Sequence, residues 1–485
     1  MTSTRKILIT GATGYIGRRL KTQLITRGDI VLRLLVRNRN KVSVEVRDRI
    51  DIVEGDTFHQ EALDKALEGV DTAYYLIHSM GAEKDFEDLD RKSAENFRDA
   101  AIRAGVKRII YLGGLGVRES ASKHLLSRIE TGEILSARSS EIQTIWFRAG
   151  VIIGSGSASF DIIRNLVQKL PCMITPKWVT TRTQPISVDD VISYLVAAID
   201  LPQENNLMVD IGTEAMSFKQ MMLDAAKVMG LRRWMIPVPF LSPRLSSYWL
   251  ILFTPVPFKV ASALVEGLKS ETVAQNDHAA RYFPEITPLT YHQAVAMAMK
   301  ELEEHKVISR WCDSSAGVAC DIKEHDDPGG SILRDVRVLP LEGASPAAVY
   351  RAACSIGGEH GWYTYNFLWR LRGFIDKLVG GFGLSRGRRI ADELRVGDAL
   401  DFWKVADLKK NKRLLLLAQM KVPGKAWLEF DIQPDQLVQT AHFLPSGVWG
   451  RIYWHSVAPL HNLVFVDLAR KIIATAKALD SASIS

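Results

Sequence analysis

The sequence predicts two domains, an α/β domain with a doubly wound parallel sheet followed by an α+β domain. The chain has 485 residues, which exceeds the roughly 250–300 residues at which a single hydrophobic core stops growing. Its first part alternates short β-branched runs with helical stretches, a pattern typical of βαβ units. Its last part has a series of strands followed by one long helix, which is typical of an α+β unit.

The α/β pattern extends from Lys6 to about Leu201 and begins with a strand. The expected strands are Lys6–Thr10, Val31–Val36, Ile50–Glu54, Thr72–Ile77, Arg108–Leu112 and Gln143–Arg148, with a further one at Leu207–Ile211. The expected helices, with apolar residues at helical spacing, include Ile16–Thr26, Gln60–Leu67, Phe86–Ala104, Leu125–Ser139 and Phe218–Met229. We assign residues 1–310 to this domain.

A segment rich in Asp, Ser, Gly, His and Pro predicts a linker at residues 311–330. The second domain, residues 331–485, is expected to begin with a strand at Ser331–Leu339 and a helix from Ala347 to about Ser355. An irregular region rich in Trp and Gly then extends to about Arg389. Further strands are expected at Ala399–Asp407, Arg413–Lys421, Lys425–Ile432, Leu437–Pro445 and Gly450–Val457, before a last helix from about Leu460 to Leu479.

The composition, 47% hydrophobic and 24% charged, excludes wholesale disorder. The formal net charge is +7, but the basic residues are scattered and no nucleic-acid motif accompanies their densest groups, so we expect no nucleic-acid partner. The cysteines show neither CxxC spacing nor a nearby histidine, which supports neither a metal site nor a disulfide framework; they are Cys172, Cys312, Cys320 and Cys354.

The expected first strand begins within a few residues of Met1, which leaves no room for a signal peptide, so we expect a cytoplasmic protein. The segment Leu245–Leu268 is largely apolar. Two prolines, Lys259 and Glu266 interrupt it, leaving fewer than the ~20 apolar residues that a membrane-spanning helix needs. A buried or surface-covering helix pair is favoured over an interfacial membrane contact.

A glycine-rich loop follows the first expected strand and opens a helix: Thr10-Gly11-Ala12-Thr13-Gly14-Tyr15-Ile16-Gly17. Gly11 permits a tight turn, Gly14 lets the backbone approach a diphosphate, and Gly17 allows close packing of helix and strand. The amides and dipole of the helix then face the negative charge. The alternative is an ordinary tight turn, but the βαβ context favours a dinucleotide site.

The spacing GxxGxxG resembles the short-chain dehydrogenase/reductase (SDR) superfamily, particularly its extended and atypical branches that include NmrA-like proteins. Further matches are Gly55-Asp56, Asn96 and the stretch Gln184–Asp190, and the resemblance covers about residues 5–300. It implies a Rossmann domain that binds NADP(H) or NAD(H). The cofactor contacts that it implies are Gly11, Thr13, Gly14, Tyr15, Ile16, Gly17, Arg37, Asp56, Thr57, His78, Ser79 and Gly113.

Arg37 favours NADP(H) over NAD(H). NAD-specific members of the superfamily carry an acidic residue at the end of the second strand, where it binds the ribose hydroxyl. This chain has Arg37 there, with Arg39 close by, and a guanidinium can pair with a 2′-phosphate. The alternative interpretation is a surface arginine on a loop.

The acid–base pair of the superfamily is absent. Its Tyr-x-x-x-Lys motif is replaced by His124-Leu-Leu-Ser-Arg128, and Gly113-Gly114 stands where the superfamily places a serine. His124 could act as the acid–base group with Arg128 holding it, since imidazole titrates near neutrality. Alternatively both residues are structural and the domain binds a dinucleotide without chemistry, as some NmrA-like redox sensors do.

The stretches His124–Arg128, Gly154–Phe160 and Thr254–Pro257 resemble a bacterial family in which an atypical SDR domain precedes an uncharacterised C-terminal domain, and the resemblance covers nearly the full chain. The second domain is similar to the helix-grip fold of polyketide cyclases and lipid-transfer proteins, which encloses an apolar cavity. The candidate lining residues, most of which could equally fill the core, are Trp362, Tyr365, Trp369, Trp403, Trp427, Trp449, Trp454 and His455.

Two hypotheses follow from the sequence. The first is an NADP(H)-dependent oxidoreductase acting on an apolar or carbonyl-containing small molecule that the second domain delivers or holds. The second is a dinucleotide-binding sensor or assembly factor without turnover. The sequence predicts neither the substrate nor the oligomeric state.

Overall fold

The chain forms two compact units, residues 1–314 and residues 315–485. A computed structural model describes residues 4–39, 42, 50–78, 86–175, 177–202, 204–237, 264–267, 270–304, 309, 332–357, 361–378, 394–445 and 447–482. The predicted linker at residues 311–330 and most of Leu245–Leu268 lie outside these ranges. Within them, no helix has both the length and the apolar content needed to cross a membrane.

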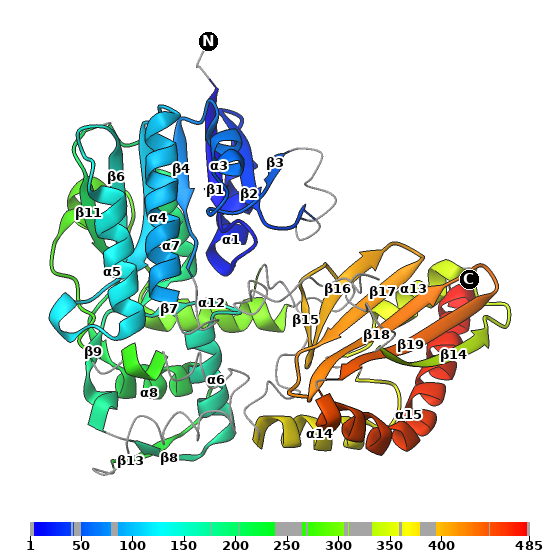
Figure 1. Ribbon diagram of the computed structural model, residues 1–485. Helices are drawn as coiled ribbons and strands as arrows, with labels where there is room; N and C mark the ends of the chain where they lie inside the picture. The colour runs from blue at the N-terminus through cyan, green and yellow to red at the C-terminus, as the bar shows by residue number, and fades with distance from the viewer. Residues whose placement is uncertain are drawn as a thin grey trace. The chain divides into compact units, whose positions relative to one another are not determined.

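A parallel sheet of seven strands forms the centre of the N-terminal unit (Figure 1). Its spatial order is β3 (Asp51–Glu54), β2 (Ile30–Val36), β1 (Arg5–Thr10), β4 (Thr72–Tyr75), β5 (Arg108–Gly114), β6 (Gln143–Ala149) and β11 (Leu207–Ile211). These are the seven strands that the sequence predicts, with ends moved by at most two residues. The direction of winding reverses between β1 and β4, where dinucleotides bind in folds of this kind.

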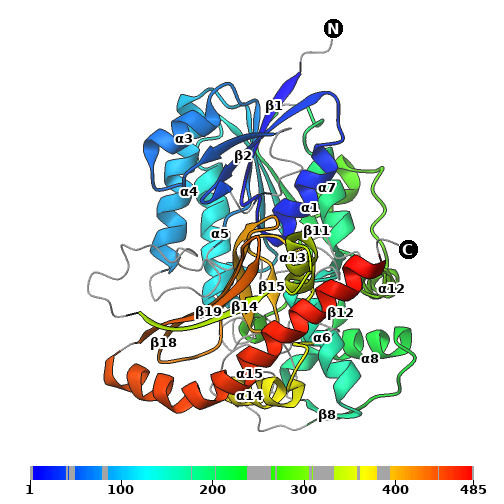
Figure 2. The same cartoon turned by 90° about the vertical axis from the view of Figure 1, so that its right-hand side faces the viewer.

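Helices cover both faces of this sheet (Figure 2). One face carries α1 (Tyr15–Leu24) and α7 (Val188–Ala197), and the other carries α3 (Gln60–Leu67), α4 (Phe86–Arg103) and α5 (Lys123–Ser136). Neighbouring residues of β1 serve different layers, since Ile7 and Ile9 pack with α1 and α7 whereas Leu8 packs with α3 and α4. Because both faces are buried, the strands are continuous apolar runs rather than alternating ones.

A smaller lobe of the N-terminal unit contains α6 (Ala158–Lys169), α8 (Phe218–Val228) and α12 (Tyr291–Glu303), which share one apolar core. Its short elements are β7 (Ile152–Ile153), β8 (Cys172–Thr175), β9 (Arg182–Thr183), β10 (Ile186–Ser187), β12 (Met216–Ser217) and β13 (Trp234–Pro237), whereas α11 (His278–Tyr282) packs against the core of the main sheet. Arg19 of α1 connects the lobe to the sheet, because its buried guanidinium donates to the Ser155 carbonyl (3.2 Å) and to Glu301 (3.0 Å).

The C-terminal unit is an α+β unit with a six-stranded antiparallel sheet (Figure 1). The strand order is β14 (Leu333–Pro340), β19 (Gln436–Pro445), β18 (Gly424–Ile432), β17 (Arg413–Ala418), β16 (Trp403–Lys409) and β15 (Ala399–Leu400). Helices α13 (Pro346–Cys354) and α15 (Gly447–Ala482) share one apolar core with the sheet. The α+β class is therefore confirmed, and the assignment to the helix-grip fold stays a prediction.

Two sequence predictions for the C-terminal unit are wrong. The strand expected at Gly450–Val457 is the beginning of α15, which contains Pro459 and bends along its length in Figure 1. The aromatic and β-branched residues there suggested a strand, but Trp449 and Ile452 follow a helical spacing. The region described as irregular contains α14 (Asn366–Leu378).

Candidate functional site

The glycine-rich loop is shaped by close approaches that only glycine allows. Gly11 has a φ of +67°, and a Cβ there would lie 2.4 Å from the Leu76 carbonyl oxygen. A Cβ on Gly17 would lie 2.3 Å from the Gly11 carbonyl oxygen. The loop closes through a hydrogen bond from Gly14 N to Gly11 O (2.9 Å). The carbonyl of Thr13 accepts a further bond from Arg18 Nε (2.9 Å).

Helix α1 begins at this loop with its amides available to a ligand. Gly14 is the N-cap residue, no side chain caps the helix, and the first turn contains no acidic residue. Four amides at a helix N-terminus lack partners within the helix, and the helix dipole makes that end positive. The amides of Tyr15, Ile16 and Gly17 therefore lie at the helix end where the sequence predicts the diphosphate, and their contact with a cofactor stays a prediction.

The loop is held at the switch point between β1 and β4. Thr10 Oγ1 donates to the Tyr74 carbonyl (2.9 Å) and accepts from the Leu76 amide (3.2 Å). The side chain of Tyr15 points away from the loop amides, since its hydroxyl donates to the Ser155 carbonyl (3.2 Å) and its burial raises its pKa. Tyr15 can therefore contribute its amide to a cofactor while its ring holds the smaller lobe.

The residues predicted to contact the ribose and adenine of a dinucleotide differ in how accessible their side chains are to a ligand. Arg37 is exposed at the end of β2, and among the described residues neither it nor Arg39 forms an ion pair. Asp56 Oδ1 accepts from the Phe58 amide (2.9 Å) and contacts His59 Nδ1 (2.7 Å), which fixes the turn after β3. Thr57 is buried, with its hydroxyl 2.6 Å from that of Ser93, so its side chain has a structural role.

A second group of side chains lies beyond the carboxyl ends of β4 and β5. The rings of His78 and His124 are 6.5 Å apart between centroids and nearly perpendicular. His124 stacks on Phe86 of α4 at 4.4 Å, and its Nδ1 is buried without a hydrogen-bond partner among the described residues. Arg128, one turn further along α5, donates from Nη2 to the Leu112 carbonyl (3.4 Å) at the end of β5.

Burial lowers the pKa of both imidazoles. For His78, burial and the nearby Arg128 lower the pKa, although Asp90 acts in the opposite direction. His78 Nδ1 lies 3.3 Å from Asp90 Oδ2, which also accepts a hydrogen bond from Ser127 Oγ (3.0 Å). For His124, burial outweighs the carboxylates of Glu266 and Asp90, which raise the pKa. Both rings are therefore largely neutral at pH 7 and can accept a proton.

Gly113 has a packing role that the sequence did not reveal. A Cβ at residue 113 would lie 2.4 Å from Trp146 Nε1, so the indole occupies the space that a side chain would need. Asp90 and Phe86 were also missed, although both lie on the predicted helix Phe86–Ala104, and their proximity to His78 and His124 depends on tertiary packing. Ser79 lies outside the described residues.

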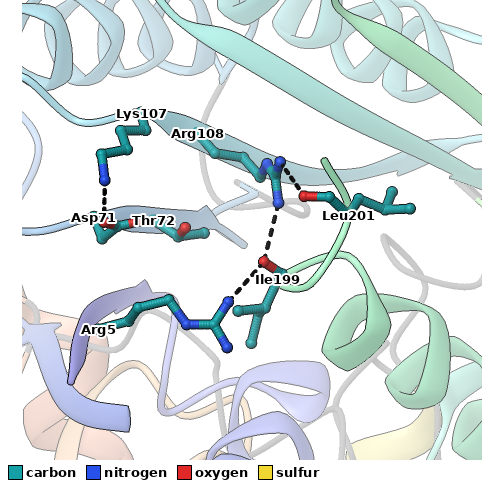
Figure 3. Close-up of a pocket in the computed structure, with 7 residues that line it drawn as sticks. All are labelled: Arg5, Asp71, Thr72, Lys107, Arg108, Ile199 and Leu201. Atoms are coloured by element: carbon teal, nitrogen blue, oxygen red, sulfur yellow. Dashed lines mark hydrogen bonds and ion pairs between the residues drawn. The ribbon is translucent and has the colours of Figure 1, made fainter. Parts of the chain in front are cut away.

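A pocket of about 170 Å³ lies at the opposite, amino-terminal edge of the sheet, lined by Arg5, Asp71, Thr72, Lys107, Arg108, Ile199 and Leu201 (Figure 3). Its cations are already engaged. Arg108 donates to the carbonyls of Ala198 (2.7 Å) and Leu201 (2.7 Å), and Arg5 donates to that of Ile199 (3.1 Å). These bonds satisfy the carbonyls after α7, so we assign this pocket a structural role.

The predicted lining residues of the C-terminal unit separate into two groups. Trp362 is buried, donates from Nε1 to Asp401 (2.8 Å), and lies 4.8 Å from the ring of Trp369. Trp403 belongs to the same core, Trp427 is buried elsewhere in the unit, and Tyr365 and Trp454 pack against the main core. Trp449 and His455 are exposed, so neither lines an interior cavity.

Within the described residues, no three His, Cys, Asp or Glu side chains form a group that could hold a metal ion. Cys172 is exposed and Cys354 is buried, and neither forms a disulfide with another described residue. Cys312 and Cys320 lie outside the described residues.

Comparison with known proteins identifies the kind of domain in each unit. Residues 11–142 match the NAD(P)H-binding family, and residues 328–468 match a family described as a protein of unknown function, DUF2867. The ceramide reductase of Caulobacter vibrioides is 29% identical over 239 residues, covering 48% of this chain and 73% of that protein. The (4-alkanoyl-5-oxo-2,5-dihydrofuran-3-yl)methyl phosphate reductase of Streptomyces griseus is 26% identical over 232 residues, which cover 46% of this chain and 74% of that protein.

Among solved structures, the triphenylmethane reductase of a Citrobacter species is 20% identical, with a TM-score of 0.49, and covers 61% of this chain and 99% of its own. The family match of residues 11–142 and the seven-stranded parallel sheet together identify an NAD(P)H-binding Rossmann domain of the SDR-like type in the N-terminal unit. The C-terminal unit contains a DUF2867 domain.

Proposed function

We propose that the N-terminal unit is a reductase that uses NADPH to reduce an apolar or carbonyl-containing small molecule. The observation that carries the proposal is the position of His78, His124 and Arg128 beyond the strand ends that adjoin the glycine-rich loop. Gly11 of the glycine-rich loop lies against Leu76, which is two residues before His78 in the chain. The predicted diphosphate site and the acid–base groups therefore lie at one edge of the sheet. The two reductases named above, which match about half of this chain, support the same reaction class.

The dinucleotide, when bound, supplies a hydride to the carbonyl carbon of the substrate. The amides at the start of α1 bind the diphosphate, and the exposed Arg37 pairs with the 2′-phosphate of NADPH. These contacts would hold the cofactor at the switch point between β1 and β4.

The proton comes from His124. Its protonated ring donates a proton to the substrate oxygen, becomes neutral imidazole, and is reprotonated from solvent. Arg128, at position i+4 of the same helix, places a permanent positive charge on the same side and stabilises the developing negative charge on oxygen. His78, held by Asp90, contributes to the wall of this site.

The test is NADPH oxidation with a panel of ketones, aldehydes and quinones. We expect turnover of at least one apolar member, and His124→Gln should lower kcat by about 10²–10⁴-fold, the usual contribution of a general acid. The matched control is Lys123→Gln, which changes the exposed neighbouring residue of α5 and should leave kcat unchanged. Equal kcat in His124→Gln and the parent would remove His124 from the mechanism.

The alternative function is a dinucleotide-binding sensor without turnover. It is favoured by Trp146, whose indole fills the space of a side chain at Gly113, one of the two glycines that stand where the superfamily places a serine. Tight NADPH binding combined with no oxidation across the whole panel would support this alternative and overturn the reductase.

A further inference from the structure

Helix α14 of the C-terminal unit presents its apolar side to solvent. Phe367, Leu371, Phe374 and Ile375 follow the spacing i, i+4, i+7, i+8 and therefore share one side of the helix. All four are exposed, Phe367 to 66% and Phe374 to 55%. A helix on a protein surface normally buries this side, so the arrangement indicates an interaction site.

The opposite side of α14 fixes the helix in this orientation. Asp376 is fully buried and accepts a hydrogen bond from the Lys421 amide (2.7 Å). Trp369 packs against the core of the unit, 4.8 Å from the ring of Trp362. Because these residues hold one side inward, rotation of α14 cannot bury the apolar side.

The beginning of α15 extends the same surface. Trp449 is 76% exposed and Ile452, three residues later, is 53% exposed. Arg372 of α14 joins the two helices, since its Nη2 donates to the Tyr453 hydroxyl (3.3 Å). Figures 1 and 2 both show α14 beside the first part of α15. We call this surface the α14–α15 patch, formed by Phe367, Leu371, Phe374, Ile375, Trp449 and Ile452.

The charges around the α14–α15 patch are positive. Arg370 and Arg451 are exposed next to it, and Arg372 lies between the two helices. The only acidic residue of α14 is the buried Asp376, and the first twenty residues of α15, 447–466, contain none. The patch therefore combines exposed aromatic and aliphatic side chains with cations and presents no exposed carboxylate within these two segments.

We propose that the α14–α15 patch docks this protein onto the surface of an anionic phospholipid bilayer. Helices satisfy their own backbone hydrogen bonds, so their apolar sides can enter the boundary between headgroups and acyl chains. Trp and Phe favour that boundary, and arginine can extend its charge to lipid phosphates. Two copies packed patch to patch would instead bring like charges together, which disfavours self-association.

The test is flotation of the full chain with vesicles of phosphatidylcholine alone or with phosphatidylglycerol added. The parent should bind the anionic vesicles, and binding should weaken as salt is raised. The double variant Phe367→Ser, Phe374→Ser should bind at least ~10-fold more weakly, because it loses two exposed aromatic rings that enter the bilayer on binding. The double variant Arg370→Glu, Arg451→Glu should also bind at least ~10-fold more weakly, since each arginine near such a surface contributes about fivefold.

Matched controls separate the patch from general effects. Val336→Ser, Val338→Ser removes two exposed apolar side chains from β14, and Lys410→Glu, Lys412→Glu reverses two exposed cations between β16 and β17. Both controls should bind vesicles like the parent. A cooperative thermal melt at the parent's temperature for every variant confirms that the C-terminal unit is folded, and this readout is independent of the lipid result.

Either of two results would overturn the proposal. In the first, the parent and the two patch variants float equally. In the second, the parent does not float but forms a dimer or captures a protein partner through the patch, and the patch variants do not. The second result would identify the patch as a protein interface.

Discussion

The indole of Trp146 lies directly against Gly113, and a Cβ on residue 113 would come within 2.4 Å of its Nε1. Gly132 of α5 meets the same indole from another side, where a Cβ would lie 2.3 Å from Cε2. Trp146 on β6 is thus accommodated by two glycines on neighbouring elements. This packing leaves no room for a serine side chain at residue 113 of β5.

Gly113→Ser should therefore destabilise the N-terminal unit rather than restore a missing catalytic serine. Overpacking of a buried site costs ~1–3 kcal/mol, and we expect a loss of that size in the free energy of unfolding measured with urea. The cost should be smaller in a Trp146→Phe background, because the smaller ring leaves room for the serine. Full stability together with increased turnover in Gly113→Ser would show that the indole moves aside readily.

Arg37→Ala should weaken NADPH binding and leave NADH binding almost unchanged. A charge-assisted contact to the 2′-phosphate contributes ~1.5–3 kcal/mol, which corresponds to roughly 10- to 100-fold in affinity. Lys65→Ala, which removes another exposed cation on α3, is the control and should affect neither cofactor. Equal NADPH affinity in Arg37→Ala and the parent would leave the preference for NADPH without support.

The proposed reduction should depend on pH through His124. Burial lowers the pKa of His124 from its ordinary value of 6.5, so the protonated ring that donates to the substrate exists mainly below pH 6.5. The rate of carbonyl reduction should fall as pH rises through this lowered pKa, whereas the reverse alcohol oxidation, which needs the neutral ring, should rise. Profiles of kcat/KM against pH for both directions test this. An identical profile in His124→Gln would assign the pH dependence to another group.

Asp90→Asn should lower the pKa of His78 further. The carboxylate of Asp90 lies 3.3 Å from His78 Nδ1 and is the main group that raises this pKa against burial. Without this carboxylate, burial and Arg128 lower the pKa of His78 with no opposing effect from residue 90. An NMR titration of the His78 ring measures the change, with Ser127→Ala as the control that removes a hydrogen bond to Asp90 but keeps the carboxylate. An upward or absent shift in Asp90→Asn would contradict this assignment.

The ion pair between Arg148 and Asp210 should contribute strongly to stability. The two side chains are almost completely buried and joined by two bonds of 2.6 and 2.8 Å across β6 and β11. Asp210→Ala leaves a buried guanidinium unpaired and should cost ~3–5 kcal/mol of unfolding free energy. Asp64→Ala, which breaks the exposed pair with Arg103, should cost at most ~1 kcal/mol. Similar costs for the two variants would show that Arg148 finds a new partner.

The sequence predicted the N-terminal sheet well because strands buried on both faces are apolar runs bounded by turn residues. It also predicted the tight turn at Gly11 and the close packing at Gly17 correctly, since both depend on local geometry. The contacts around His78, His124 and Asp90 were out of reach, because they join residues from β4, α4 and α5 that only tertiary packing brings together. The strand expected at Gly450–Val457 was wrong. Aromatic residues in this segment are typical of strands, but Trp449 and Ile452 follow a helical spacing and lie on one exposed side of α15.

The most direct test of the account is calorimetric titration with NADPH and NADH of the parent and two variants at Gly14. This residue has a φ of −80°, which any residue can adopt, and it is the N-cap of α1, where both Asp and Ser are favourable. We predict that Gly14→Asp keeps the fold but binds NADPH at least ~10-fold more weakly, because its carboxylate repels the diphosphate, whereas neutral Gly14→Ser binds more like the parent. The account is contradicted if the parent shows neither heat nor a thermal-melt shift with either dinucleotide.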